Sequence, residues 1–249
     1  MGESKLRVVL LAYTPEPEKL AALAGRRCYS RLGNAELIAG EARRDPAALI
    51  QKLVRMGHVT VIEHAAFTFA VEGVSRSLLA QITRHRLASF SVQSQRYVGE
   101  TAAANPEGVF DYIVPPSIAA LGAEARAEFA RQMRQIQEWY DCWVHKLGGD
   151  REAYEDARFV LPNAAETKFV FTMNARELLH FFALRCCERA QWEIRRLAEE
   201  ILRLVKPLAP TIFAAAGPAC LRGPCPEGEL YCGKIKEVRA RYRVDPEEA

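Results

Sequence analysis

The spacing of apolar residues in the N-terminal part of the chain predicts one strand followed by helices. The apolar run within Lys5–Tyr13 is typical of a strand, and the stretches 17–27 and 35–56 repeat apolar residues at helical spacing. Pro46 falls inside the second helical stretch and should divide it, because proline interrupts the helical hydrogen-bond ladder. Gly57 is a suitable residue for the end of this stretch.

A second strand and a short helix are predicted next along the chain. Phe67–Val71 alternates large apolar residues with smaller ones, as half-buried strands do, and Gly73 should end this strand. Ser75 can cap the following helix, and apolar residues at helical spacing carry that helix to Arg86. A polar loop is then expected to run to about Tyr97.

The C-terminal half predicts long helices and one further strand. Apolar residues at helical spacing predict a helix over 117–145, and Lys168–Met173 has the composition of a strand. Asn174 can cap the next helix, with Glu177 three residues later in the place of a capping-box acid. A further helical run reaches Lys206.

The order of these elements predicts an α+β fold, with mixed helices around a mainly antiparallel sheet. Helices and strands do not alternate regularly along the chain. No glycine-rich phosphate loop follows a strand, which argues against the dinucleotide-binding and phosphate-loop folds built on parallel sheets.

Composition and charge limit the kinds of molecule that the protein is expected to bind. Of the 249 residues, 49% are hydrophobic and 26% charged, and the formal net charge is +3. So small a net charge disfavours general binding to nucleic acid, and any anion site must come from local clusters of arginine. The N-terminus lacks the layout of a signal peptide and no apolar run reaches membrane length, so we expect a cytoplasmic protein without a membrane partner.

The chain has seven cysteines, which a cytoplasmic protein should keep reduced. Cys220, Cys225 and Cys232 lie in a tail rich in glycine and proline. They could bind zinc if a fourth ligand came from elsewhere, form a redox disulfide, or remain unused, and their spacing is not the paired spacing of familiar zinc sites. Cys186 and Cys187 are interpreted as buried small apolar residues.

His58, Glu63 and His64 form another group with metal-binding side chains. Their spacing fits no zinc pattern, because no helix presents two histidines one turn apart. We therefore expect no metal in the functional site.

The most distinctive polar pattern is Arg84-His85-Arg86, then seven residues, then Ser94-Gln95-Arg96. Guanidinium groups match phosphate oxygens in two-point contacts, and serine hydroxyls with free backbone amides can complete an anion cradle. The same residues could instead be a surface helix end, where cations are favourable to the helix dipole. Physical chemistry alone leaves both interpretations open.

Further candidates lie downstream. Arg158 stands between apolar residues and is either an ion-pair partner or an anion ligand. Asn174 opens a helix, whose first backbone amides can bind an anion, and Arg176 and His180 share a face of it. Arg185 lies among apolar residues and needs a partner, for which a bound ligand is one candidate.

These motifs together resemble those of the flavin-dependent thymidylate synthase (ThyX) family. The family signature R-H-R, seven residues, S-x-R matches Arg84 to Arg96, and other family motifs occur in the same order. They are His58-x-Thr60-x-x-Glu63-His64, Gln81, Arg158-x-Val160-Leu161-Pro162, Asn174-x-Arg176, Leu184-Arg185 and Ala190-Gln191-Trp192-Glu193. The resemblance implies a catalytic domain over residues 1–216, followed by the tail over residues 217–249.

The resemblance also implies a reaction and its ligands. It implies that dUMP is methylated to dTMP, with methylenetetrahydrofolate as carbon donor, FAD as hydride carrier and NADPH as reductant. It further implies a homotetramer with active sites shared between subunits. No nucleic-acid partner is implied.

Residue by residue, the resemblance assigns two sets of contacts, with Arg185 as the catalytic residue that stabilises negative charge on the uracil ring. For FAD the residues are Thr60, Arg84, His85, Arg86, Val92, Asn174, Arg176 and His180, with Ser30 as a further candidate. For dUMP they are Gln81, Arg84, Val92, Gln93, Ser94, Gln95, Arg96, Arg158 and Arg185. The side chain of Val92 cannot accept a hydrogen bond, so only its backbone can serve there.

Two other functions are compatible with the sequence. A non-catalytic nucleotide- or RNA-binding protein could use the same arginine clusters, and its binding would depend steeply on salt. A zinc-stapled interaction module could form from the cysteine tail. Visible flavin absorbance and metal analysis separate these two from the enzyme.

Overall fold

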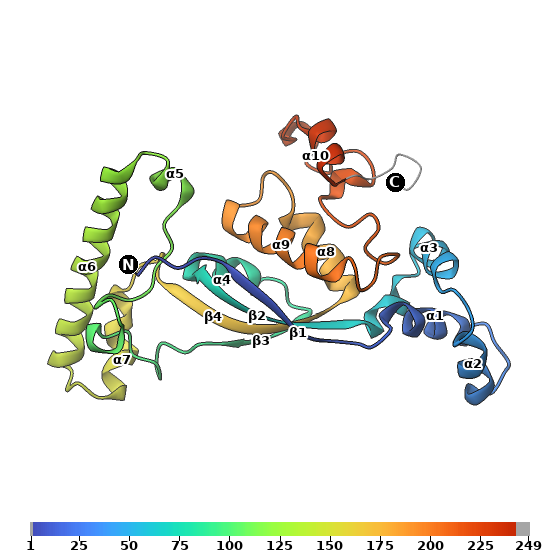
Figure 1. Ribbon diagram of the computed structural model, residues 1–249, viewed down its shortest axis with the longest axis horizontal. Coiled ribbons are helices and arrows are strands. Elements are labelled where there is room, and N and C mark those ends of the chain that lie inside the picture. Colours follow the sequence, from blue (N-terminus) through green and yellow to red (C-terminus); the bar gives the residue numbers. More distant parts are fainter. Residues whose placement is uncertain (1, 243–249) are drawn as a thin grey trace. The chain divides into compact units, whose positions relative to one another are not determined.

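The computed structural model describes residues 2–242 (Figure 1). The chain divides into two compact units. Unit 1 contains the chain up to Arg7, Ala70–Arg84 and Phe90–Val170. Unit 2 contains Val8–Phe69, His85–Ser89 and the chain from Phe171 onward. In the described part of the chain, no helix combines the length and the apolar character needed to cross a lipid bilayer.

A four-stranded sheet has the order β1-β2-β4-β3, which confirms the predicted α+β class with an antiparallel sheet. The strands are β1 (Arg7–Tyr13), β2 (Ala66–Ser75), β3 (Ala88–Val92) and β4 (Glu166–Asn174). Alternate residues of β2 are buried, as expected for a strand that turns one face to the core. In unit 2 the rings of Phe69 and Phe171 stack across neighbouring strands, with centroids 5.1 Å apart.

Unit 1 carries the helices that lie between β2 and β4 in the sequence. They are α4 (Arg76–Ile82), η2 (Ala102–Ala104), α5 (Pro116–Ala119), α6 (Ala123–Lys146), α7 (Arg151–Ala157) and η3 (Arg158–Val160). The long helix α6 packs against α7 (Figure 1), and their buried cluster consists of Tyr140, Val144, Ala153 and Ala157. Burial of these side chains holds α7, and with it the start of η3, in a fixed position.

Unit 2 carries the remaining helices. They are α1 (Pro17–Arg27), α2 (Asn34–Glu41), α3 (Ala47–Arg55), η1 (Val59–His64), α8 (Ala175–Arg185), α9 (Trp192–Val205), η4 (Ala219–Leu221), η5 (Gly228–Leu230) and α10 (Ile235–Tyr242). Helices α8 and α9 lie next to each other (Figure 1). Phe182 of α8 and Phe67 of β2 both pack their rings against Phe213, which anchors α8 in the core of this unit.

Several local predictions are confirmed. Pro46 separates α2 from α3, and Gly57 follows α3 with a positive φ of 75°. The hydroxyl of Ser75 accepts from the amide of Leu78 at 3.1 Å, and Asn174 Oδ1 accepts from the amide of Glu177 at 2.9 Å. Both residues therefore cap their helices as short polar side chains at this position do.

Other local predictions are wrong. Helix α4 ends at Ile82 and not at Arg86, so Arg84-His85-Arg86 follows the helix instead of closing it. The expected polar loop contains strand β3, because strand pairing outweighs the polar composition of this segment. The helix predicted over 117–145 is divided at Gly122, whose φ of 104° is incompatible with a continuous helix.

Gly73 does not end β2 but lies within it, at a close approach of two backbones. Its φ is +70°, and a Cβ there would lie 1.8 Å from the carbonyl oxygen of Lys5. Its amide donates to the buried Glu166 side chain at 2.7 Å. The glycine therefore provides room and a conformation that no other residue provides.

We expect Gly73→Ala to lower the free energy of unfolding by at least about 2 kcal/mol, because it adds a backbone clash to the strain of a positive φ. Gly108→Ala is the matched control, since Gly108 also has a positive φ (67°) but has no atom within 4 Å of the added Cβ. This control should cost about 1 kcal/mol. Urea unfolding of both variants measures the difference, and equal losses would contradict the proposed clash.

Candidate active site

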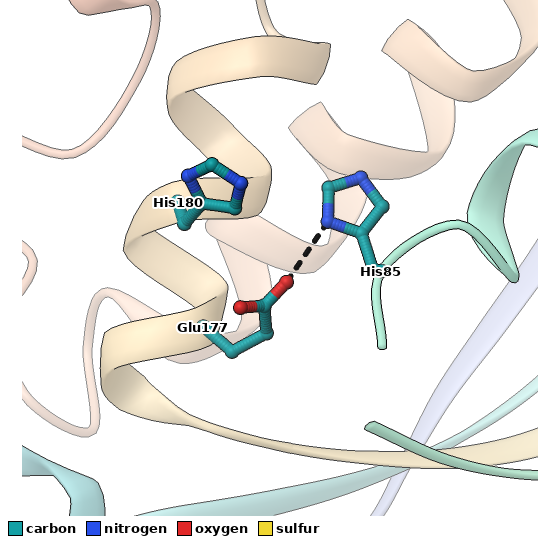
Figure 2. Close-up of side chains that lie close together, drawn as sticks. All are labelled: His85, Glu177 and His180. Carbon is teal, nitrogen blue, oxygen red and sulfur yellow. Dashed lines mark hydrogen bonds and ion pairs between the residues drawn. The ribbon is translucent and has the colours of Figure 1, made fainter. Parts of the chain in front are cut away.

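Three side chains of unit 2 are joined in a hydrogen-bonded chain. His85 Nδ1 and Glu177 Oε1 are 2.9 Å apart, and Arg185 Nε donates to His85 Nε2 at 3.1 Å. Figure 2 shows Glu177 on helix α8 with its carboxylate directed toward the ring of His85, which comes from the segment after α4. His85 and Glu177 are only 4% and 5% exposed.

The partners of His85 determine its tautomer. A guanidinium can only donate hydrogen bonds, so His85 Nε2 must accept from Arg185 and the ring proton must lie on Nδ1, where it is donated to Glu177. Burial lowers the pKa of His85, the hydrogen bond to Glu177 opposes this shift, and the charge of Arg185 adds to it. The neutral imidazole is therefore the form that orients Arg185.

Glu177 is the functional side chain that the sequence prediction assigned wrongly. It was predicted as the acid of a capping box, but its carboxylate binds His85 while only its backbone amide takes part in the Asn174 cap. The two residues are 92 positions apart, and no local pattern relates them.

His180 lies one turn after Glu177 on α8 and is exposed to solvent. Its ring centroid is 5.8 Å from that of His85, and the ligand atoms of His85, Glu177 and His180 lie within 4.8 Å of one another (Figure 2). The group has metal-binding side chains, but both His85 nitrogens already have hydrogen-bond partners and Arg185 adds a positive charge. These contacts favour use of the group as a hydrogen-bonded anchor for Arg185.

Two predicted flavin contacts come from neighbouring elements of unit 2. Arg176 at the start of α8 forms an ion pair with Glu63 of η1, the short helix that also contains Thr60. Thr60 and Arg176 are both exposed. Ser30 lies on the turn after α1, where its hydroxyl accepts from the amide of Leu32 at 3.2 Å.

Arg84 and Arg86 are exposed, and neither forms an ion pair with any residue that the structure describes. An exposed guanidinium without an internal partner keeps its donors available for an anionic ligand.

Two arginines of unit 1, Arg76 and Arg158, interact electrostatically. Burial lowers the pKa of Arg76, and the positive charge of Arg158 lowers it further. Arg158 is half-buried and donates from Nε to the backbone carbonyl of Glu155 at 2.9 Å, but forms no ion pair with the described residues. A pair of partly buried like charges is favourable when an anion binds between them. The sequence did not single out Arg76, because an arginine at the start of a helix carries no distinctive motif.

Two further predicted nucleotide contacts in unit 1 have internal partners. Arg96 binds Glu155 through Nε and a terminal nitrogen, each 2.8 Å from Oε2. Gln81 is half-buried on α4, and its Nε2 donates to the carbonyl of Ser77 at 3.3 Å. A phosphate at Arg96 would have to compete with the Glu155 carboxylate.

The loop after Val92 was predicted to offer free backbone amides, and this is wrong at three positions. The amide of Gln93 donates to the carbonyl of Lys168, that of Tyr97 donates to the carbonyl of Ser94, and that of Arg96 donates to the hydroxyl of Ser94. Val92 and Gln95 are half-buried. Anion binding by this loop would therefore depend more on side chains than on a backbone cradle.

The structure thus assembles the predicted residues in two groups. Unit 2 contains Thr60, His85, Arg86, Asn174, Arg176, His180 and Arg185. Unit 1 contains Gln81, Arg84, Val92, Gln93, Ser94, Gln95, Arg96 and Arg158. Within unit 2, the closest association is that of His85, Glu177 and Arg185.

Comparison with known proteins gives consistent matches over most of the chain. Residues 9–211 match a family model described as thymidylate synthase complementing protein. A flavin-dependent thymidylate synthase of Geobacter sulfurreducens is 51% identical over 238 residues, which cover 96% of this chain and 98% of that protein. The enzyme of the same name from Clostridium tetani is 45% identical and covers 95% of this chain and 97% of its own length.

A solved structure supports the fold. The crystal structure of a UMP/dUMP methylase from Streptomyces cacaoi, bound with 5-Br dUMP, superposes with a TM-score of 0.66. It covers 86% of this chain and 97% of its own, at 22% identity. At this identity the likeness establishes a shared fold only.

Proposed function

The chain belongs to the family of flavin-dependent thymidylate synthases, and from this premise we propose that it methylates C5 of the uracil ring of dUMP to give dTMP. The observation that carries the proposal at the site is the hydrogen-bonded chain from Glu177 through His85 to Arg185. These two hydrogen bonds fix one half-buried guanidinium in place. An electrophilic group of this kind is what the activation of a uracil ring requires.

We propose that Arg185 acts on the N3–C4 amide of uracil. A guanidinium there stabilises negative charge on the amide and raises the electron density at C5, so that no protein nucleophile is needed. Burial of the thiol raises the pKa of the nearby Cys186 to about 12, which makes this cysteine unsuitable as a nucleophile at neutral pH.

We propose FAD as the flavin, held by Thr60, Arg84, His85, Arg86, Val92, Asn174, Arg176 and His180. The exposed guanidinium of Arg86 fits its pyrophosphate, and the exposed His180 is available beside the anchored ring of His85. A bound flavin supplies the hydride that completes the methyl group. NADPH as reductant and methylenetetrahydrofolate as carbon donor complete the proposed set of ligands.

We further propose a cytoplasmic homotetramer with shared active sites, whose catalytic domain spans residues 1–216. The edge strand β1 supports an association between subunits, because Val9, Leu11 and Tyr13 on it are 41%, 53% and 44% exposed. Apolar side chains on an exposed sheet edge are typical of a surface that is covered in the assembly. Light scattering of the purified protein measures the number of subunits.

Absorbance and product formation test the proposed function. The purified protein should show flavin absorbance that bleaches with NADPH, and should form dTMP from dUMP and methylenetetrahydrofolate. FAD-loaded protein that forms no dTMP from these substrates would overturn the proposal. A colourless protein whose binding to a polyanion falls steeply with salt would indicate the nucleotide- or RNA-binding alternative.

We propose that Gln81, Arg84, Val92, Gln93, Ser94, Gln95, Arg96, Arg158 and Arg185 contact dUMP, and the Arg76–Arg158 pair gives the sharpest test. Arg158→Ala should raise the Kd of dUMP roughly 10- to 100-fold, because a charge-assisted hydrogen bond contributes about 1.5–3 kcal/mol. Arg131→Ala, which removes an exposed arginine of α6, is the matched control and should leave the Kd unchanged. Isothermal titration calorimetry measures the Kd of dUMP for both variants. Equal affinities of wild type and Arg158→Ala would remove Arg158 from the nucleotide site.

A further inference from the structure

The C-terminal tail has no role in the proposed reaction, yet it folds onto unit 2 in a defined way. Helices η4 and α10 form a small apolar cluster of Cys220, Leu221 and Val238. Cys220, Cys225 and Cys232 all lie in this tail. A fourth cysteine, Cys187, follows the end of α8.

The fold brings Cys187 to the three cysteines of the tail. A pocket of about 320 Å³ is lined by Cys187, Cys220 and Cys225, and also by Arg185 and Arg189. Burial raises the pKa of the Cys220 thiol, and the nearby thiols of Cys225, Cys187 and Cys232 raise it further. The thiols of Cys187, Cys220 and Cys225, from two separate segments, therefore line one small space, and Cys232 follows in the same tail.

Two arginines hold the segments that carry these thiols. Arg239 of α10 donates to the carbonyl of Cys220 at 3.2 Å and to that of Gly223 at 3.2 Å. Arg189, two residues after Cys187, donates to the carbonyl of Leu230 and forms an ion pair with Glu227 at 3.2 Å. These contacts fix the loop between Cys220 and Cys232 against the turn that contains Cys187.

We propose that Cys187, Cys220, Cys225 and Cys232 bind one Zn²⁺ ion, which ties the tail to the turn between α8 and α9. A set of four thiolates is a preferred ligand set of structural zinc, and the fourth ligand that the tail lacks is supplied by Cys187. The spacing of the tail cysteines alone did not reveal the site, because this ligand lies 33 positions before Cys220 in the chain.

Metal binding releases protons from the thiols, and nearby cations offset the negative charge of the resulting site. Four neutral thiols lose four protons to the solvent when they bind Zn²⁺, and the resulting site has a net charge of −2. Arg189 and Arg239 are close enough to its loop to offset that charge.

The four sulfurs are more widely spaced in the structure than in a closed zinc site. Only the His85, Glu177 and His180 group brings three ligand atoms within 4.8 Å among the described residues. Zn–S bonds of about 2.3 Å would draw the thiols inward. Gly223, Gly228 and Gly233 flank the cysteines with positive φ angles, so the loop has glycine at the turns where such an adjustment is needed.

Metal analysis of the full-length protein tests the site. Protein purified under reducing conditions should contain about one zinc ion per chain, and the double variant Cys220→Ser/Cys225→Ser should lose it. Cys142→Ser is the matched control, because Cys142 is an exposed cysteine of α6, and it should keep the metal. Zn²⁺ added to the metal-free wild type should protect four of the seven thiols from alkylation.

A second measurement does not depend on the folding of a variant. Chelation of zinc from the wild-type protein should lower Tm by at least about 4 °C, and added Zn²⁺ should restore it. Metal-free wild-type protein that takes up no Zn²⁺ would overturn the proposal. A disulfide between tail cysteines in place of bound metal, detected as two protected thiols in non-reduced protein, would also overturn it. None of these readouts depends on dTMP formation.

Discussion

Arg185→Ala is expected to lower the rate of dTMP formation by about 1000-fold while the protein stays folded. The loss of one preorganised donor to a developing negative charge costs about 3–4 kcal/mol in enzymes that depend on such a donor. Arg185 meets this description because His85 fixes its Nε, and His85 is itself fixed by Glu177. Alanine leaves the uracil without this donor. Among the described residues, no other side chain is shown to donate to His85 Nε2 in its place.

Two further variants separate the catalytic effect from a structural one. Arg185→Lys keeps the charge but loses the planar group that can donate to His85 and to the substrate together, so its rate should lie between wild type and alanine. Arg196→Ala removes an exposed arginine that lies over the Trp192 ring of α9, and should turn over normally. Single-turnover kinetics on flavin-loaded protein, with circular dichroism to check the fold, makes the comparison. A wild-type rate in Arg185→Ala would remove this residue from the mechanism.

The sequence predicted several features whose determining interaction is local. The Ser75 and Asn174 caps are confirmed because a cap depends on a side chain and an amide three residues away. The break between α2 and α3 at Pro46 is also local, because proline lacks the backbone N–H that a continuous helix needs. Strand β3 was missed because its stability comes from pairing with β4, which no neighbouring residue reports.

The sequence predicted only those residues of the candidate site that belong to recognisable motifs. The resemblance supplied Arg185 and His85, but the bond between them joins residues 100 positions apart. Glu177 was predicted to be a capping acid from its spacing to Asn174. Its partner His85 lies 92 positions away, and no local pattern indicates it. Arg76 was not given a role, and Cys187 was interpreted as a buried apolar residue although it is half-buried. Each becomes informative only when the fold brings distant charges or thiols to it.

Glu177→Gln is expected to lower turnover roughly 10- to 100-fold without loss of the fold. The substitution keeps the size of the side chain but replaces a charge-assisted hydrogen bond, worth about 1.5–3 kcal/mol, with a neutral one. A glutamine amide can also donate to His85 Nδ1, which would place the ring proton on Nε2 and prevent that atom from accepting from Arg185. Glu177 thus acts as a positioning residue, through His85.

The pH dependence of turnover distinguishes this role from a loss of stability. Activity requires neutral His85, so turnover should fall at low pH as the ring becomes protonated, below its ordinary pKa of 6.5 because burial lowers the pKa. The Glu177 carboxylate opposes that shift, so Glu177→Gln should lower the pKa further and move the acid limb to lower pH. Glu41→Gln changes another buried carboxylate, which pairs with Arg26, and should leave the acid limb in place. An acid limb at the same pH in wild type and Glu177→Gln would contradict the role of His85 as the group that orients Arg185.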